Sequence, residues 1–200
     1  MKKYIIITIL SMLSINCKSQ SHTVDIMDYD GKAIIGYYYK DVNNLLDPFT
    51  GTWIYSNGNK FIKLVLTKKV KLYNGKIYDD VVVGGIEYKE NNITIVNTLS
   101  YLNNNYDDYI KYAISGKSLF NKDFYPKCFD CQPNELRLRL SYHELNPDTS
   151  FGRLVLRKIK VNGQDAIKAE LIGKTVYYEA GTTPPLDFKL PGGEYIFIKQ

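Results

Sequence analysis

"LVLTKKVKLYNGKIYDDVVVGGIEY", residues 64–88, joins two long β-prone runs through one Asn-Gly dipeptide. Asn-Gly favours a type I′ turn, because both central residues of that turn need a positive φ angle. Asn57-Gly58 indicates the same kind of turn upstream, and Asn91-Asn92 indicates it more weakly downstream. These evenly spaced turns leave connecting strands of about 14 residues, roughly 45 Å at the usual rise per residue.

Strands of this length do not stay flat. Gly84-Gly85 falls inside one of them, and glycine within a strand often marks a bulge or a sharp bend. Long, bent strands that pair in sequence order can curl into a cylinder, which also removes exposed sheet edges. The sequence therefore predicts an all-β fold, an antiparallel meander that closes into a small barrel.

Period-two alternation supports further strands. Leu136, Leu138 and Leu140 alternate with Arg137 and Arg139, the pattern of a half-buried strand. We expect additional strands near residues 34–40, 109–115, 152–161, 166–172, 175–179 and 195–199, with a turn at 162–163, giving eight to eleven strands in all. Residues 103–108 and 117–134 are expected to be loops.

The N-terminus reads as an export signal. Lys2-Lys3 precedes a run of apolar residues, 4–15, that is too short to span a membrane, which needs about 20 residues. We expect residues 1–16 to be a signal peptide, 17–33 an anchor and tether, and 34–200 a single barrel domain.

Cys17 ends a stretch, Leu13 to Cys17, that resembles a bacterial lipobox, in which the cysteine is acylated and becomes the new N-terminus. Asn16 departs from the small residue usual at that position. The alternative is a plain signal peptide cleaved nearby. The expected location is the periplasm or outer membrane as a lipoprotein, with the membrane contacted through the lipid, or secretion without acylation.

Charge and composition argue against nucleic-acid binding. The formal net charge is +5, and it falls to +3 when Lys2 and Lys3 are removed. The basic residues are interleaved with apolar strand positions rather than gathered into a stripe. We expect one monomeric domain with a sizeable core, since 44% of the residues are hydrophobic.

Cys128 and Cys131, in "KCFDC", allow three interpretations. A thioredoxin-like pair would start a helix after a strand, but prolines and polar residues frame this segment as a loop. A zinc site would need two further ligands, and the chain has only His22 and His143. A disulfide suits an oxidising compartment, and we expect it here.

Gly51 and Trp53 open the first long strand. Gly-x-Trp at this place resembles the N-terminal signature of lipocalins, in which the tryptophan closes the barrel floor and packs against an arginine from a late strand. This resemblance implies a lipocalin/calycin-like barrel, with Arg153 or Arg157 in the arginine's role. A large core side chain is the simpler interpretation of Trp53.

A wider resemblance covers most of the chain. "YYYKDVNNLLDPFTGTW", residues 37–53, followed by "LVLTKKVKLYNGKIYDDVVVGGIEY" and "NNITIVNTL", is similar to an uncharacterised family of secreted and lipid-anchored Bacteroidetes proteins, grouped as a domain of unknown function. The resemblance implies location and a β-rich domain, and brings no activity or catalytic residue.

No catalytic pattern emerges. His143 is the only realistic base for nucleophilic catalysis, and strand alternation turns it outward with the arginines. No phosphate-binding glycine loop is present, since Gly84-Gly85 lacks the spacing. The two carboxylates of a glycosidase come together only in the folded protein, and nothing in this sequence nominates such a pair. We expect a non-enzymatic protein without cofactor, metal ligands or catalytic residues.

Two classes of function remain open. In the first, the barrel interior or mouth holds a small apolar or amphipathic ligand. In the second, the interior is filled and the protein acts through its surface, as an interaction or carbohydrate-contacting module rich in tyrosine, including residues 37–39 and 177–178. A cavity inside the barrel favours the first class and a filled interior the second.

Overall fold

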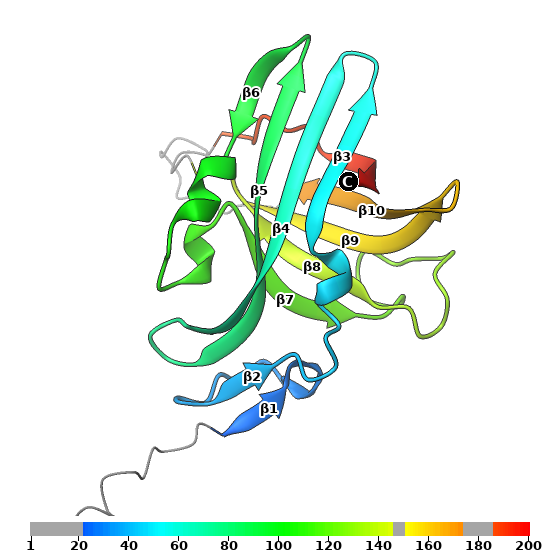
Figure 1. Cartoon of the computed structure of the whole chain (residues 1–200). Coiled ribbons are helices and arrows are strands. Elements are labelled where there is room, and N and C mark those ends of the chain that lie inside the picture. Colours follow the sequence, from blue (N-terminus) through cyan, green and yellow to red (C-terminus); the bar gives the residue numbers. More distant parts are fainter. Residues whose placement is uncertain (1–21, 146–150, 174–185) are drawn as a thin grey trace, which may run out of the picture.

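The computed structural model describes residues 22–145, 151–173 and 186–200, and in this part of the chain the fold is all-β (Figure 1). Eleven strands form one continuous sheet. They are β1 (Thr23–Asp25), β2 (Tyr38–Lys40), β3 (Gly51–Asn57), β4 (Lys60–Tyr73), β5 (Tyr78–Glu90), β6 (Ile93–Asn97), β7 (Ile114–Phe120), β8 (Arg137–Tyr142), β9 (Gly152–Val161), β10 (Gln164–Gly173) and β11 (Gly193–Lys199). Short 3-10 helices are η2 (Ile26–Asp28), η3 (Asp47–Phe49), η4 (Leu99–Asn103) and η5 (Tyr109–Lys111).

Eight antiparallel strands close into a barrel, in the order β5, β4, β3, β11, β10, β9, β8 and β7. The ring closes where β7 returns to β5, with Val82 opposite Gly116 and Gly84 opposite Ile114. The all-β barrel expected from the sequence is confirmed. In the described chain, no helix has the length and apolar character needed to cross a bilayer.

The predicted turns connect the hairpins β3–β4, β4–β5, β5–β6 and β9–β10. Asn91, Asn92, Asn162 and Gly163 all have positive φ, as a type I′ turn requires. β4 has 14 residues and β5 has 13, close to the expected length.

The strand irregularity does not lie at the glycine pair. The β4–β5 register shifts between Lys69 and Leu72, where Lys71 has a φ of 53° and donates its backbone N–H to the Asp80 carboxylate (2.9 Å). Gly84 and Gly85 keep regular pairing with β4. Their lack of a side chain instead lets neighbouring backbone approach closely, because a Cβ on Gly85 would lie 2.9 Å from the carbonyl oxygen of Thr98.

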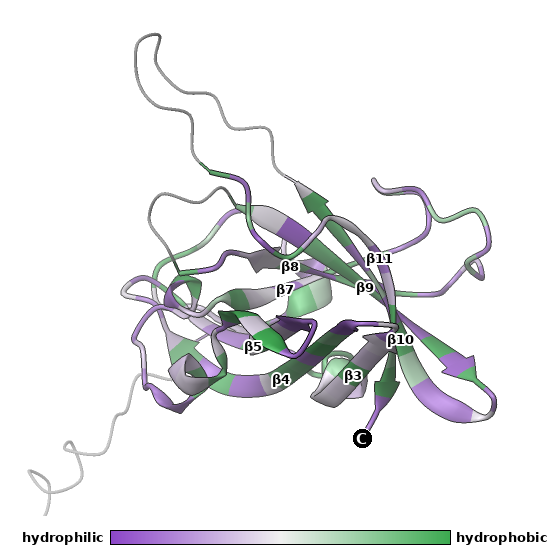
Figure 2. Ribbon diagram, turned by 90° about the horizontal axis from the view of Figure 1, so that it is seen from above, coloured by the Kyte–Doolittle hydropathy of each residue, from purple (hydrophilic) through white to green (hydrophobic). Residues whose placement is uncertain are grey.

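Side chains fill the barrel interior. Apolar and polar residues alternate along the strands (Figure 2), and the apolar set points inward. The largest fully buried side chains include Trp53, Tyr88, Tyr142 and Phe197. Ile62, Leu64, Leu138, Leu156 and Ile167 are each 0% exposed, so no space for water adjoins them.

A second, smaller core lies outside the barrel. Val81 and Val83 on the outer face of β5 pack with Tyr112, and the segment carrying η4 and η5 covers them. β5 is therefore buried on both faces, which explains its continuous apolar run in place of alternation.

Part of the segment expected to be a tether, residues 17–33, packs on the barrel. β1 pairs in parallel with β2, and β2 pairs in parallel with the start of β5. Ile26, on η2, and Tyr39 join the barrel core. In Figure 1 these elements lie at one end of the barrel.

Several expected strands shift. Only Tyr38–Lys40 of residues 34–40 is a strand, Tyr109–Lys111 is η5, and β7 continues to Phe120 where a loop was expected. β9 has the predicted bounds, and β10 and β11 each extend past their predicted segments. The strand expected at 175–179, the signal segment 1–16 and Cys17 lie outside the described residues.

Replacing Gly85 by alanine should destabilise the fold by roughly 1–3 kcal/mol, because the methyl group meets backbone atoms of Thr98 and Leu99 that cannot rotate away. Gly173→Ala is the matched control, since nothing lies within 4 Å of its Cβ position. Urea unfolding followed by circular dichroism measures both. Equal midpoints for the two variants would contradict the close-approach role.

Candidate functional site

Trp53 belongs to the barrel core. Its side chain is buried, and its indole N–H donates to the carbonyl of Phe49 at 3.0 Å. The cation above its ring is Lys199 of β11, whose Nζ lies 5.2 Å from the ring centroid. The suggestion that Arg153 or Arg157 plays this part is wrong, because Arg157 is paired with Asp130 and Glu135 and the last strand supplies a lysine instead.

The polar side chains in the segment from Lys40 to Trp53 stabilise a tight turn. Asp41 is buried and accepts hydrogen bonds from the backbone N–H groups of Leu45 and Leu46, at 2.7 and 3.0 Å. Lys68 of β4 bridges the Asp41 and Asp47 carboxylates at 2.8 and 2.7 Å. Gly51 has a φ of 126°, a conformation that favours glycine. These polar groups satisfy a tight turn and leave none of its carboxylates free for chemistry.

The tyrosine run 37–39 is not a surface patch. Tyr38 and Tyr39 are buried, and the Tyr38 hydroxyl donates to Asp80 at 2.6 Å. Burial, followed by that hydrogen bond, raises the pKa of Tyr38. Tyr177 and Tyr178 lie outside the described residues.

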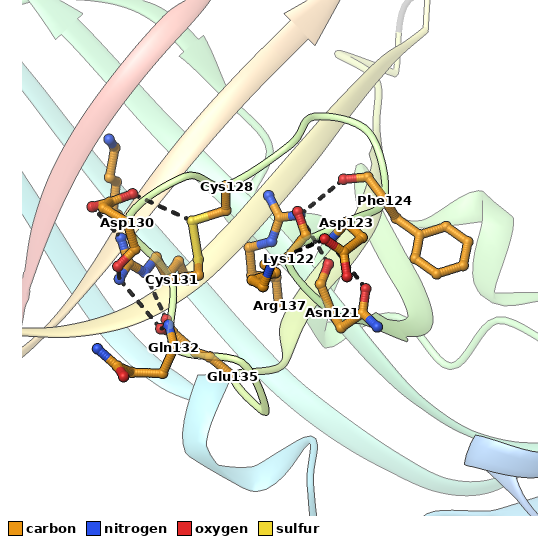
Figure 3. Close-up of a disulfide and its surroundings, with 12 residues drawn as sticks. Asn121, Lys122, Asp123, Phe124, Cys128, Asp130, Cys131, Gln132, Glu135 and Arg137 are labelled. Atoms are coloured by element: carbon orange, nitrogen blue, oxygen red, sulfur yellow. Dashed lines mark hydrogen bonds and ion pairs between the residues drawn. A yellow bond between two sulfur atoms is a disulfide. The ribbon is translucent and has the colours of Figure 1, made fainter.

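The most developed surface feature is the segment between β7 and β8, residues 121–136, here called the disulfide loop (Figure 3). Arg137, the first residue of β8, holds its beginning: Nη2 donates to the carbonyls of Asn121 and Phe124, both at 3.0 Å. In Figure 3 the Phe124 carbonyl faces Arg137 while the ring points away.

Arg157 of β9 holds the far half of the loop. Its guanidinium meets the Glu135 carboxylate at 2.6 Å and that of Asp130 at 2.6 Å, and also donates to the Asp130 carbonyl at 3.0 Å. The hydrogen bond from Arg157 lowers the pKa of Asp130. Burial alone would raise the pKa of Glu135, but Arg157 and the N–H of Gln132 outweigh it and lower that pKa. The carboxylates are thus held ionised against the barrel wall.

Cys128 and Cys131 are joined by a disulfide at the tip of the loop. With Asp130 they form the one cluster of potential metal ligands in the described chain. Bonded sulfurs are not thiolates, and the Asp130 carboxylate is engaged by Arg157, so this trio does not suit a metal ion. Asp130 Oδ1 lies 3.4 Å from Cys128 Sγ, a contact without a proton to share.

A cleft of about 490 Å³ lies between the disulfide loop and the outer wall of the barrel, and we call it the disulfide cleft. Its lining is mostly charged, with three apolar residues, and consists of Lys127, Cys128, Phe129, Asp130, Arg137, Val155, Arg157, Lys168, Glu170 and Glu194. Register explains the grouping, since Val155, Glu170 and Glu194 lie opposite one another on β9, β10 and β11. All three strands turn these residues away from the core.

Phe129 is 94% exposed at the rim of this cleft, and Phe124 and Tyr125 on the same loop are also more than half exposed. Sequence reasoning missed these three aromatic residues. Their signal was present, because aromatic side chains inside a loop rich in proline, asparagine and aspartate have no strand to pack them.

Arg137 is an unusual lining residue. It is only 4% exposed, no carboxylate of the described residues forms an ion pair with it, and its Nε has no hydrogen-bond partner there. Burial lowers its pKa. The Phe120 ring, 4.6 Å from its Cζ, and the loop carbonyls stabilise the charge.

Within the described residues, the His143 ring contacts Ile110 and Phe151. Its ring nitrogen Nε2 lies 3.1 Å from the carbonyl oxygen of Ile110, and its ring packs against Phe151 at 5.1 Å. Neither neighbour is a nucleophile or an acid.

Acid should release the disulfide loop. The pKa values of Asp130 and Glu135 are lowered in the folded protein, so the stability they confer is present above the ordinary carboxyl range, about pH 4, and is lost as pH falls through their lowered values. We expect amide NMR signals of residues 121–136 to shift on acidification before global unfolding.

Arg157→Gln should give the released loop spectrum already at neutral pH. Lys160→Gln, which breaks an exposed ion pair with Asp165 on a neighbouring strand, should not. Loop signals that stay unchanged in acid would refute the clamp.

Comparison with known proteins adds family membership and no activity. No curated protein and no solved structure shows a significant match. A family model described as "Family of unknown function (DUF6705)" matches residues 1–200, the whole chain. This agrees with the family of unknown function indicated by residues 37–53, and the chain belongs to the DUF6705 family.

Proposed function

We propose that this protein is an exported lipoprotein of the cell envelope that binds a small amphipathic molecule in the disulfide cleft without catalysing a reaction. The observation that carries the proposal is the almost fully exposed Phe129 ring beside a cleft with a charged floor. An aromatic ring so exposed has a cost in water that a ligand's apolar face would remove.

The filled interior counts against a ligand inside the barrel, the first class as the sequence posed it, and so we place the proposed site on the outer wall. A ligand in the cylinder would have to displace side chains such as Tyr142 and Phe197, which are at most 2% exposed. Such a displacement would lose close packing on all sides. The disulfide cleft, in contrast, has a volume in the range of small-molecule sites, about 300–1,000 Å³.

The lining suits a molecule with one apolar and one polar side. Phe129 and Val155 offer apolar contact, while Glu170 and Lys168 offer an acceptor and donors. Arg137 below them supplies a positive charge that lacks a carboxylate partner among the described residues. The clamps by Arg137 and Arg157 fix the loop before binding, which reduces the entropy lost when a ligand binds.

The same residues support a role in binding without catalysis. The described lining includes no serine, threonine or histidine, and Cys128 is in a disulfide. Glu194 is paired with Lys168 at 2.7 Å, which leaves Glu170 without a second free carboxylate for acid–base work.

A second candidate function is supported by Phe124 and Tyr125. They are 62% and 67% exposed and do not line the disulfide cleft. They would serve a surface module that contacts a partner or a carbohydrate, the other function class open from the sequence.

Octyl glucoside below its micelle concentration is a suitable amphipathic probe for full-length protein. We expect it to bind and raise the melting temperature, whereas glucose does neither. Phe129→Ala should weaken binding about tenfold, as loss of a good aromatic contact does. Phe151→Ala, an exposed phenylalanine away from the cleft, is the control.

Native mass spectrometry of protein from its own cells should also reveal a co-purifying molecule. Absence of such a molecule, together with equal probe binding by the two phenylalanine variants, would overturn the proposal. If Phe124→Ala weakens binding and Phe129→Ala does not, the second candidate is favoured.

Acylation of Cys17 is tested separately. Cells fed an alkyne analogue of palmitate should label the protein, and Cys17→Ser should remove the label and move the protein from the membrane to the soluble fraction. The Cys128→Ser/Cys131→Ser double variant should keep the label. Label that persists in Cys17→Ser would contradict the lipid anchor.

A further inference from the structure

A second cleft on the barrel's outer wall has a different character. It measures about 410 Å³ and lies where η2 and η5 approach strands β7, β8 and β9. Its lining combines three serines with three cationic side chains: Ile26, Met27, Tyr29, Tyr109, Ile110, Ser115, Gly116, Lys117, Ser118, Leu119, Arg139, Leu140, Ser141 and Arg153. We call it the serine cleft. Its described lining includes no aspartate or glutamate.

Strand register places the polar groups together. Ser115 lies opposite Ser141, and Ser141 lies opposite Arg153, so these three form one row across β7, β8 and β9. Ser118 lies opposite Arg139 in a neighbouring row, and Arg139 Nη2 is 3.1 Å from the Ser118 hydroxyl oxygen. Long side chains at such diagonal positions on paired strands can reach one another.

In the part of the chain that the structure describes, the two arginines of the serine cleft lack counterions. Neither Arg139 nor Arg153 forms an ion pair with a carboxylate of the described residues, although the chain has almost as many acidic as basic residues. Arg139 and Arg153 lie at diagonal positions on adjacent strands, so an anion between them would be attracted by both guanidinium groups. Guanidinium groups donate hydrogen bonds in a fork that matches phosphate and sulfate oxygens.

Lys117 contributes less charge than the arginines. It is paired with the buried Asp79 and lies 4.7 Å from the ring centroids of both Tyr29 and Tyr39. Burial lowers the pKa of Lys117, although the hydrogen bond that its ammonium donates to Asp79 acts to raise it. Asp79 therefore offsets the ammonium from behind, and the net positive charge of the cleft comes from Arg139 and Arg153.

We propose that the serine cleft binds the tetrahedral oxyanion, phosphate or sulfate, of a small ester. Arg139 and Arg153 neutralise its charge, and the hydroxyls of Ser118 and Ser141 donate to its oxygens. The cleft is several times larger than the oxyanion alone, so the remainder of the molecule lies against Met27, Ile110 and the Tyr109 ring. This site is separate from the disulfide cleft and does not depend on it.

Calorimetric titration of full-length protein with glucose 6-phosphate and glucose 6-sulfate tests the proposal, with glucose as the neutral control. At least one ester should bind saturably, less tightly as salt is added, and glucose should not bind. The ester that binds more tightly identifies the source of the oxyanion.

Arg153→Gln and Ser141→Ala should each weaken binding, by about tenfold or more for the arginine, as expected on losing a charged hydrogen bond. Both residues are exposed, so folding should be retained. Lys158→Gln removes one charge from the same strand outside the cleft and should leave affinity unchanged, as should Phe129→Ala in the disulfide cleft.

Two results would overturn the proposal. One is the absence of saturable binding for both esters at low salt. The other is equal weakening by Lys158→Gln and Arg153→Gln, which would show attraction to the overall charge rather than a site. The octyl glucoside experiment with Phe129→Ala tests only the disulfide cleft, so either proposal can be refuted without affecting the other.

Discussion

The pairing of β7 with the middle of β5 is the constraint on which the rest of the structure depends. β5 pairs with β4 along its whole length on one side, and on the other it pairs with β2, β7 and β6 in turn. Only a long strand can accept three partners on one edge. Closure leaves the eight barrel strands without an unpaired edge along their middle. It also brings Ile114 of β7 against Gly84, where an added Cβ would lie 3.2 Å from the Ile114 Cβ and 2.9 Å from the carbonyl oxygen of Val65 on β4.

Closure also determines where function can lie. A cylinder of eight strands has room for side chains alone or for one small ligand, and here Trp53, Tyr88, Tyr142 and Phe197 occupy that room. The outer wall, with its polar residues, is then the part of the barrel that remains accessible. The disulfide loop packs over part of that wall and forms the disulfide cleft, and the 3-10 helices η2 and η5 pack over another part and form the serine cleft.

Buried charges join the N-terminal segment to the barrel. Asp80 accepts from the Tyr38 hydroxyl and from the backbone N–H of Asp41, while Asp79 meets Lys117. Burial raises the pKa of Asp79 and lowers that of Lys117 in spite of their contact. The pair lies between β5 and β7, and the Lys117 ammonium also lies over the Tyr29 and Tyr39 rings of the N-terminal segment. Removing either partner would leave a buried charge without its counterion.

Local chemistry in the sequence determined the β class, the hairpins at Asn74, Asn91 and Asn162, the long β4 and β5, and the inward leucines of β8, because turn preference and period-two alternation act over a few residues. Tertiary structure alone decided that β7 closes on β5, that Lys199 covers Trp53, and that residues 99–112 bury the outer face of Val81 and Val83. It also decided both clefts, since each gathers residues from strands and loops distant in sequence. Such contacts depend on how paired strands curve in space, which no local pattern encodes.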